Sequence, residues 1–94
     1  MAYVMNYKLN EDGTTTPVAD IYEWARSFET TNRQVAEDEF GDARISTVFL
    51  GIDHSFGGGP PLLFETMIFG GPYDMWQMRW VTRDEAAAGH VAVV

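Results

Sequence analysis

The sequence contains no cysteine among its 94 residues. Without thiols the chain has no disulfide framework, no thiol nucleophile and no thiolate metal site, so any metal would need histidine and carboxylate ligands. Basic residues are also few, because six Lys and Arg stand against 14 Asp and Glu and give a net charge of −8. Such a charge repels nucleic acid and anionic membrane surfaces, and it attracts basic partners. The composition therefore disfavours direct DNA or RNA binding.

Long hydrophobic runs are missing too. No apolar stretch approaches the roughly 20 residues that span a bilayer, and the first nine residues alternate as a strand does, unlike a signal peptide. Apolar residues nevertheless make up 46% of the chain and aromatic residues 14%, which is typical of a globular protein rather than a disordered one. We expect residues 1–94 to form a single soluble domain in the cytoplasm, without contact to a membrane.

The middle of the chain, RISTVFLGIDHSFGGGPPLLFETMIFGG at 44–71, consists of two apolar runs around a turn of three glycines and two prolines. The pattern predicts a β-hairpin with strands at 44–54 and 62–69. If these strands pair around residues 57–58, Glu65 lies opposite residues near 50 and His54 opposite residues near 61. Both faces of the first strand are largely apolar. This is typical of a central strand that is covered on both sides, or on one side with an oligomer contact on the other.

Helices are predicted on both sides of this hairpin. An Asp-x-x-Glu capping box begins at Asp20 and precedes an apolar stripe at helical spacing, which predicts a helix over 21–29. A Thr-x-x-Glu box begins at Thr82, and the Ala-rich segment behind it predicts a helix to about residue 92. Within this second helix, Gly89 is either a C-cap or a weak point.

Further strands complete the predicted sheet. Short connections between successive strands favour an antiparallel meander, and each helix must bury its apolar stripe on a sheet face. We therefore predict an α+β fold, an antiparallel β-sheet of about four strands with one or two short helices packed on it and an N-terminal hairpin beside it. The further strands are expected at 3–9, 14–18, 33–40 and 75–81.

Two stretches resemble a family of small phage and prophage proteins: STVFLGIDHSFGGGPPLLFETMIFGG at 46–71 and TRDEAAAGH at 82–90. Members share DH, FETM and GH elements in the order STVFLGLDHxF…PxLFETMVFGG…EAxxGH. The turn in this chain is richer in glycine than the family pattern. The resemblance implies a phage-like origin and action in the host cytoplasm, and it implies no particular chemistry.

Four ionisable residues are the candidates for chemistry: Asp53, His54, Glu65 and His90. Carboxylates and imidazoles bind divalent metals or act as acid/base pairs, and burial can raise the pKa of a Glu towards that of His. The four residues lack metal-ligand spacing, however. The favoured interpretation is structural, with Glu65 paired to Arg79 or Arg44, because buried charges are normally paired. We expect no catalytic residue, metal or cofactor.

The glycine-rich turn and an acidic stretch are candidate contact features. The turn lacks the Lys and Ser/Thr of a phosphate loop, so it is interpreted as a hairpin loop that exposes Phe56 and Gly58. The acidic stretch is typical of a solvated edge that prevents sheet-to-sheet aggregation, and it would also steer a basic partner. Mimicry of DNA needs a longer and denser acidic array. The acidic residues are Glu37, Asp38, Glu39 and Asp42.

Trp76, Met78 and Trp80 recur at every second position, with Tyr73 just upstream. This spacing places them on one face of the strand at 75–81, which is most often a face covered by a helix or by a second copy. Aromatic and Met side chains also anchor protein contacts. Trp76 and Trp80 are therefore candidates both for a core and for a binding face.

These features favour a small non-enzymatic phage-type accessory protein that binds a host or phage protein, with Trp76, Trp80 and the loop at 56–61 as contacts. We also expect a homodimer, because two short helices leave part of a sheet uncovered. The alternatives are a minimal metal-dependent or acid/base enzyme built on the four ionisable residues, an acidic DNA mimic or anti-defence inhibitor, and a structural virion or assembly protein.

Overall fold

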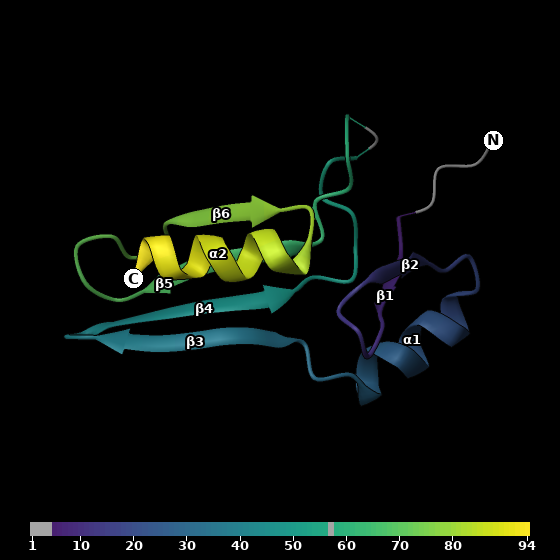
Figure 1. Ribbon diagram of the computed structural model, residues 1–94, viewed down its shortest axis with the longest axis horizontal. Helices are drawn as coiled ribbons and strands as arrows, with labels where there is room; N and C mark the ends of the chain where they lie inside the picture. Colours follow the sequence, from purple (N-terminus) through teal and green to yellow (C-terminus); the bar gives the residue numbers. More distant parts are fainter. Residues whose placement is uncertain (1–4, 57) are drawn as a thin grey trace.

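The computed structural model describes residues 5–56 and 58–94, which form two antiparallel sheets and two helices. The elements are β1 Tyr7–Leu9, β2 Thr15–Pro17, α1 Ile21–Thr30, β3 Gln34–Phe40, β4 Ala43–Phe49, β5 Phe64–Phe69, β6 Gln77–Trp80 and α2 Arg83–Val93. The larger sheet is a meander in the order β3-β4-β5-β6, and α2 lies across one of its faces (Figure 1). The smaller sheet pairs β1 with β2 and lies with α1 at the other end of the molecule. The predicted α+β fold is confirmed.

Capping side chains set where both helices begin. Asp20 is the N-cap of α1, and its carboxylate accepts hydrogen bonds from backbone N–H groups of the first helical turn. The Thr82 hydroxyl accepts from the N–H of Glu85, whose carboxylate in turn accepts from the N–H of Val81. These bonds satisfy N–H groups that have no partner inside the helix. Both predicted helix starts are confirmed, and each helix ends one residue beyond its predicted end.

The α2 face of the larger sheet is buried. On β4, Ile45, Thr47 and Phe49 lie on this face, as the two-residue repeat of a strand requires. On β5 the same face carries Phe64 and Thr66, which pair with Phe49 and Thr47 across the two strands. The central strands therefore supply the floor on which α2 packs.

The opposite face of the larger sheet carries ion pairs. Arg44 of β4 contacts Glu37 of β3 with 2.7 Å between Nη1 and Oε1, and its guanidinium lies 4.6 Å from the centroid of the Phe69 ring. On the neighbouring strands, Nε of Arg79 lies 3.1 Å from Oε2 of Glu65. This face is thus charged across the strands, in contrast to the largely apolar face expected from β4 alone. An antiparallel sheet can keep such a face in water.

The chain leaves the sheet sooner than predicted, which corrects the strand expected at 44–54. β4 ends at Phe49, and Gly51 follows with a φ of 78°, in the left-handed region that glycine adopts without steric cost. Ile52 then forms an antiparallel bridge with Asn6 instead of continuing the ladder to β5. The segment therefore turns towards the N-terminal hairpin.

The connection between β4 and β5 is longer than a tight hairpin turn, because it runs over residues 50–63. Its pairing register is shifted by two residues from pairing centred on residues 57–58, since Glu65 pairs with Val48. Glycines and prolines indicate that a turn is present, but they do not determine how many residues the connection contains. The pairing register of the two strands depends on that number of residues. Gly57, within the predicted turn, lies outside the described residues.

The outer strands are also shorter than predicted. β6 spans Gln77–Trp80, within the strand expected at 75–81. It begins late because Met75 has a φ of 71°, which is outside the extended region of a strand. β1 begins at Tyr7 within the strand expected at 3–9, of which residues 3 and 4 lie outside the described part of the chain. β3 matches the strand expected at 33–40 to within one residue.

One hydrophobic core joins the hairpin to the larger sheet. Helix α1 contributes little to it, since none of the α1 residues is buried. Instead, Trp24 of α1 donates a hydrogen bond from Nε1 to the Gly51 carbonyl at 3.0 Å and stacks on Phe28. The predicted apolar stripe of α1 therefore packs beside β1 and Gly51 rather than on the larger sheet. The core consists of Phe49, Leu63, Phe64 and Ala86, with Tyr7, Leu9, Val35 and Trp80 packed around it.

Candidate functional site

Asp53 holds the connection between β4 and β5 together. Its side chain is buried, and Oδ1 accepts hydrogen bonds from the N–H of Ser55 at 2.7 Å and from the N–H of Leu62 at 3.0 Å. The Ser55 hydroxyl donates to Oδ2 at 3.0 Å. A buried carboxylate is stable when several donors surround it. Asp53 thus links the two ends of a segment in which regular strand pairing has stopped.

His54 follows Asp53 in the sequence but contacts other groups. Its Nδ1 lies 2.8 Å from the carbonyl oxygen of Ile52, and since a carbonyl only accepts, Nδ1 carries a proton and donates. The ring lies edge-on to Phe56, with 6.1 Å between ring centroids. Phe56 itself is exposed, and the N–H of Gly58 donates to the Ser55 carbonyl. The two predicted loop contacts therefore lie at the surface, at the opposite end of β4 from the β3–β4 turn.

Glu65 and His90 lie on opposite faces of the sheet. Glu65 points away from α2 and accepts from Nε of Arg79, which confirms the predicted pairing with Arg79. Its neighbour Thr66 points to the other face, where His90 lies. The four acid/base candidates therefore do not meet at one place. Within residues 5–56 and 58–94, no group of three or more His, Asp or Glu residues could hold a metal ion.

His90 belongs to a row of hydrogen-bonded polar side chains that runs beneath α2. Its Nε2 lies 2.7 Å from Oδ2 of Asp38 on β3, and its Nδ1 lies 2.7 Å from Oγ1 of Thr47 on β4. The row continues from Thr47 to Thr66, with 2.6 Å between the hydroxyls, and reaches the indole Nε1 of Trp80 at 3.0 Å. Thr47 and Thr66 are fully buried, so each hydroxyl depends on partners within the row.

Hydrogen-bonding chemistry fixes the two ends of this row. The indole N–H of Trp80 only donates, and a carboxylate such as that of Asp38 only accepts. Trp80 therefore donates to the Thr66 hydroxyl, and Nε2 of His90 donates to Asp38. Between these ends, either threonine hydroxyl can donate to the other, and the role of Nδ1 of His90 depends on the tautomer of the ring.

An Asp, a His and a hydroxyl in series also make up the catalytic triad of hydrolases, in which the histidine activates the hydroxyl for attack. Here Thr47 is fully buried beneath α2, and His90 is buried as well, so a substrate cannot reach the hydroxyl. We interpret the row as the attachment of α2 to the sheet. The sequence did not reveal it, because Thr47 and Thr66 are ordinary strand residues until their register is known.

The acidic stretch of β3 is divided between the two faces of the sheet. Asp38 faces α2, with about half of its side chain exposed. Glu37 faces the other side, where the hydrogen bond from Arg44 holds the pKa of Glu37 below its usual value. Glu39 is exposed on β3, and Asp42 lies in the turn that follows. Negative charge thus lines an edge strand whose outer side has no strand partner in the sheet.

Trp76 and Trp80 have different environments. Trp80 packs against α2 so closely that a Cβ on Gly89 would overlap the six-membered ring of its indole. Gly89 is therefore a packing position in the middle of α2, neither a C-cap nor a break. Trp76 precedes β6 in the β5–β6 loop and is 40% exposed. Of the three residues predicted to share a strand face, only Met78 and Trp80 lie in the strand.

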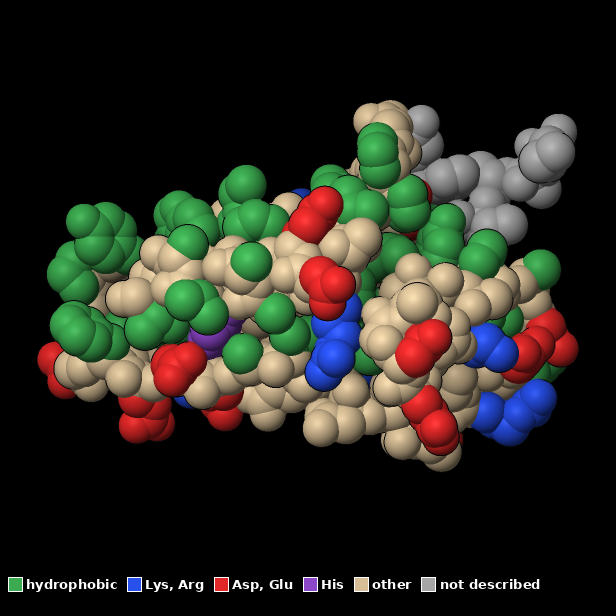
Figure 2. All heavy atoms as spheres, in the orientation of Figure 1, with side chains coloured by type: hydrophobic (Ala, Val, Ile, Leu, Met, Phe, Trp, Pro, Cys, Tyr) green, Lys and Arg blue, Asp and Glu red, His purple; other side chains and the backbone are tan. Residues whose placement is uncertain are grey.

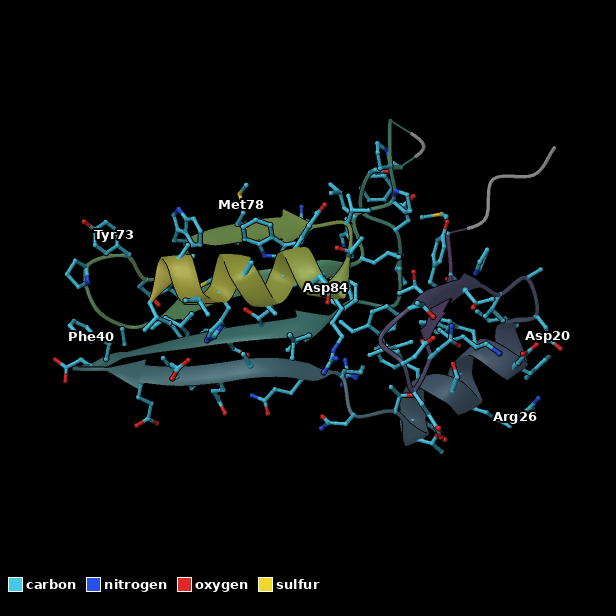
Figure 3. All side chains as sticks on the ribbon, in the orientation of Figure 1. Asp20, Arg26, Phe40, Tyr73, Met78 and Asp84 are labelled. Atoms are coloured by element: carbon cyan, nitrogen blue, oxygen red, sulfur yellow. The ribbon has the colours of Figure 1, made fainter. Side chains whose placement is uncertain are left out.

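Large apolar side chains gather at the end of the molecule formed by the β3–β4 turn, the β5–β6 loop and the last turn of α2 (Figure 2). Phe40 and Tyr73, both labelled in Figure 3, are 73% and 70% exposed. Sequence reasoning missed Phe40 because an apolar residue at the end of a strand gives no sign of whether another element covers it. We call this surface the apolar end and define it as Phe40, Tyr73, Met75, Trp76 and Val94.

No family model, curated protein or solved structure matches this chain. The resemblance to small phage proteins, which the middle of the sequence suggests, therefore stays a prediction. In the described part of the chain, neither helix has the length and apolar character needed to cross a bilayer.

Proposed function

We propose that this protein acts by binding another protein through its apolar end and has no catalytic activity of its own. The observation that carries the proposal is the exposure of several large apolar side chains in one place. Aromatic and Met side chains are the usual anchors of protein interfaces, and a gathered apolar patch marks an interaction surface. The ionisable residues that were candidates for catalysis instead make structural contacts: Asp53 links two parts of the β4–β5 connection, Glu65 pairs with Arg79, and His90 joins α2 to the sheet.

A phage origin and action in the host cytoplasm, both expected from the sequence, belong to the same proposal. The net charge of −8 favours a basic partner. Mimicry of DNA is not favoured, because Glu37 and Asp38 point to opposite faces of the sheet and do not form one array.

A second copy of this chain is the competing occupant of the apolar end. The homodimer expected from the sequence would bury the same side chains, and a symmetric contact would place each patch against its own equivalent. Light scattering of the purified protein at increasing concentration distinguishes this case, since only self-association through the apolar end is reversed by polar substitutions there.

The proposal is tested with two double variants, each of which replaces two large exposed side chains by serine. Tyr73→Ser with Trp76→Ser removes two anchors of the apolar end. Ile21→Ser with Tyr22→Ser removes two exposed apolar side chains of α1, away from the apolar end and from the loop at 56–61, and is the matched control. Tagged proteins are exposed to a bacterial lysate, and retained proteins are quantified by mass spectrometry. We expect the control to retain the same partner as the wild type and the apolar-end variant to lose it.

Two outcomes would contradict the proposal. One is equal retention of the partner by both double variants, which would place the interface elsewhere. The other is a monomeric wild-type protein that retains nothing. Thermal unfolding of each variant is the necessary control, because a loss of binding counts only where the variant remains folded.

A further inference from the structure

The apolar end contains a groove of about 450 Å³. Ile45 and Ile68, on adjacent strands, line it together with Phe40 of β3 and Tyr73 of the β5–β6 loop, while Val93 closes it from α2. A hollow of this size accommodates a few apolar side chains of a partner.

The walls of the groove are held in place by local contacts. The β5–β6 loop lies so close to the β3–β4 turn that a Cβ on Gly70 would overlap the carbonyl oxygen of Asp42. The N–H of Gly70 also donates to the Asp74 carboxylate at 2.6 Å. The groove is therefore preformed, and a ligand would not need to order these loops on binding.

The charges around the groove are of one sign. Asp42 lines it, Asp74 lies in the adjoining loop, and Asp38 is half exposed where β3 meets α2. None of the described residues that line the groove is Lys or Arg, and Arg44 points to the opposite face of the sheet, where it pairs with Glu37. Helix α2 also ends here, and the C-terminal end of a helix carries a partial negative charge.

We infer that this groove binds a basic amphipathic segment of another protein, with apolar side chains in the groove and Lys or Arg side chains facing Asp42, Asp38 and the end of α2. The inference rests on the proposed function and names the class of partner. A cation placed beside exposed carboxylates and a helix C-terminus gains favourable electrostatic energy, and an anion there is repelled. The apolar groove alone would accept a basic or an acidic amphipathic segment, so the surrounding negative charge determines that the partner is basic.

A second copy of the chain fits this groove poorly. Symmetric pairing of two apolar ends would bring Asp42 and Asp74 of each copy towards the same acidic residues of the other. Like charges that face each other across an interface cost energy and suppress that pairing. Charge complementarity therefore favours a basic partner over self-association.

The test uses the full chain and two synthetic peptides with the same helical spacing of leucines, one carrying lysines and the other glutamates at the remaining positions. Binding is measured by calorimetry at low and at high salt. We expect the lysine peptide to bind, the glutamate peptide not to bind, and high salt to weaken the complex. Two variants then locate the site: Asp42→Asn should weaken binding about two- to fivefold, and Ala43→Phe, which fills the groove, about tenfold or more.

Glu11→Gln, a charge removal in the β1–β2 turn, is the matched control and should leave binding unchanged. Equal binding of the two peptides, absence of binding by both, or an Asp42→Asn variant indistinguishable from Glu11→Gln would overturn the inference. If the peptides fail while the Tyr73→Ser, Trp76→Ser variant still loses its captured partner, the proposed function stands and the basic class of partner is wrong. Self-association that Ala43→Phe abolishes would assign the groove to a second copy and would also overturn the inference.

Discussion

Thr47 and Thr66 are polar residues in the best-packed part of the molecule, and each is fully buried. A buried hydroxyl that lacks a partner costs about 1–3 kcal/mol. The row from Trp80 to Asp38 avoids that cost, because each group has a hydrogen-bond partner within it. At the scale of single residues, polar groups that suggest chemistry in the sequence thus serve to fix α2 in one position.

Replacement of Thr47 by Val tests this row. Valine has nearly the same shape, so the change removes the hydroxyl and leaves Nδ1 of His90 and the hydroxyl of Thr66 without their partner. We expect a loss of about 1–3 kcal/mol in the free energy of unfolding, measured by urea denaturation with Trp fluorescence. Thr15→Val, in strand β2 outside the row, is the control and should change stability by less than about 0.5 kcal/mol.

The double variant Thr47→Val, Thr66→Val gives a second readout. Since both residues belong to one row, the second substitution should cost less than it does alone. Strictly additive losses, or a Thr47→Val variant as stable as Thr15→Val, would show that the hydroxyls are not coupled.

The scale of secondary-structure elements is illustrated by the contact between α2 and β6. Gly89 lies in the middle of α2, where glycine lowers helix stability by about 1 kcal/mol relative to alanine. Its position is explained by the indole of Trp80, which occupies the space that a Cβ would need. The close approach also brings His90, the next residue, into the core.

Gly89→Ala should therefore destabilise the protein, although the same change stabilises an isolated helix. The overlap with the indole ring forces Trp80 or the helix to move, and such overpacking costs about 1–3 kcal/mol. The thermal midpoint should fall in the wild-type background. Trp80→Phe replaces the two-ring indole by a smaller side chain. In that background, Gly89→Ala should lower the thermal midpoint less, or raise it. A gain of stability in the wild-type background would contradict the packing role.

Element starts were predictable from the sequence where a local interaction sets them. Asp20 and Thr82 are N-caps, and the side-chain bonds that define a cap involve only the next few residues. The end of β4 was not predictable, because Gly51 within an apolar run is compatible with a continuing strand. Only the bridge between Ile52 and Asn6 shows that the chain turns to a distant partner.

The candidate site shows the same limit. A pairing of Glu65 with Arg79 or Arg44 was predicted, because a buried charge needs a partner, and the structure shows that the partner is Arg79. The row through His90 was not predicted, because it requires side chains from four strands, at residues 38, 47, 66 and 80, to meet beneath one helix. Exposure of Phe40 likewise depends on what the rest of the fold leaves uncovered.

At the scale of the whole molecule, the two helices are attached very differently. Helices α1 and α2 have similar lengths, 10 and 11 residues. Helix α2 buries Ala86, Gly89 and His90, while α1 has no buried residue and is attached through Trp24 and Phe28 beside Gly51. Elements with little buried apolar surface open locally at a lower free energy than the core does.

Hydrogen exchange should therefore separate the two ends of the molecule. We expect the amides of α1 to exchange well before those of α2 and of β4, because α1 can unfold locally while the larger sheet remains intact. Trp24→Phe, which removes the hydrogen bond to the Gly51 carbonyl, should speed exchange in α1 and leave α2 unchanged. Since both helices are similarly long, a difference in length does not account for this result. Equal protection of α1 and α2, or a Trp24→Phe effect that spreads to β4, would instead show that the hairpin, α1 and the larger sheet unfold as one cooperative unit.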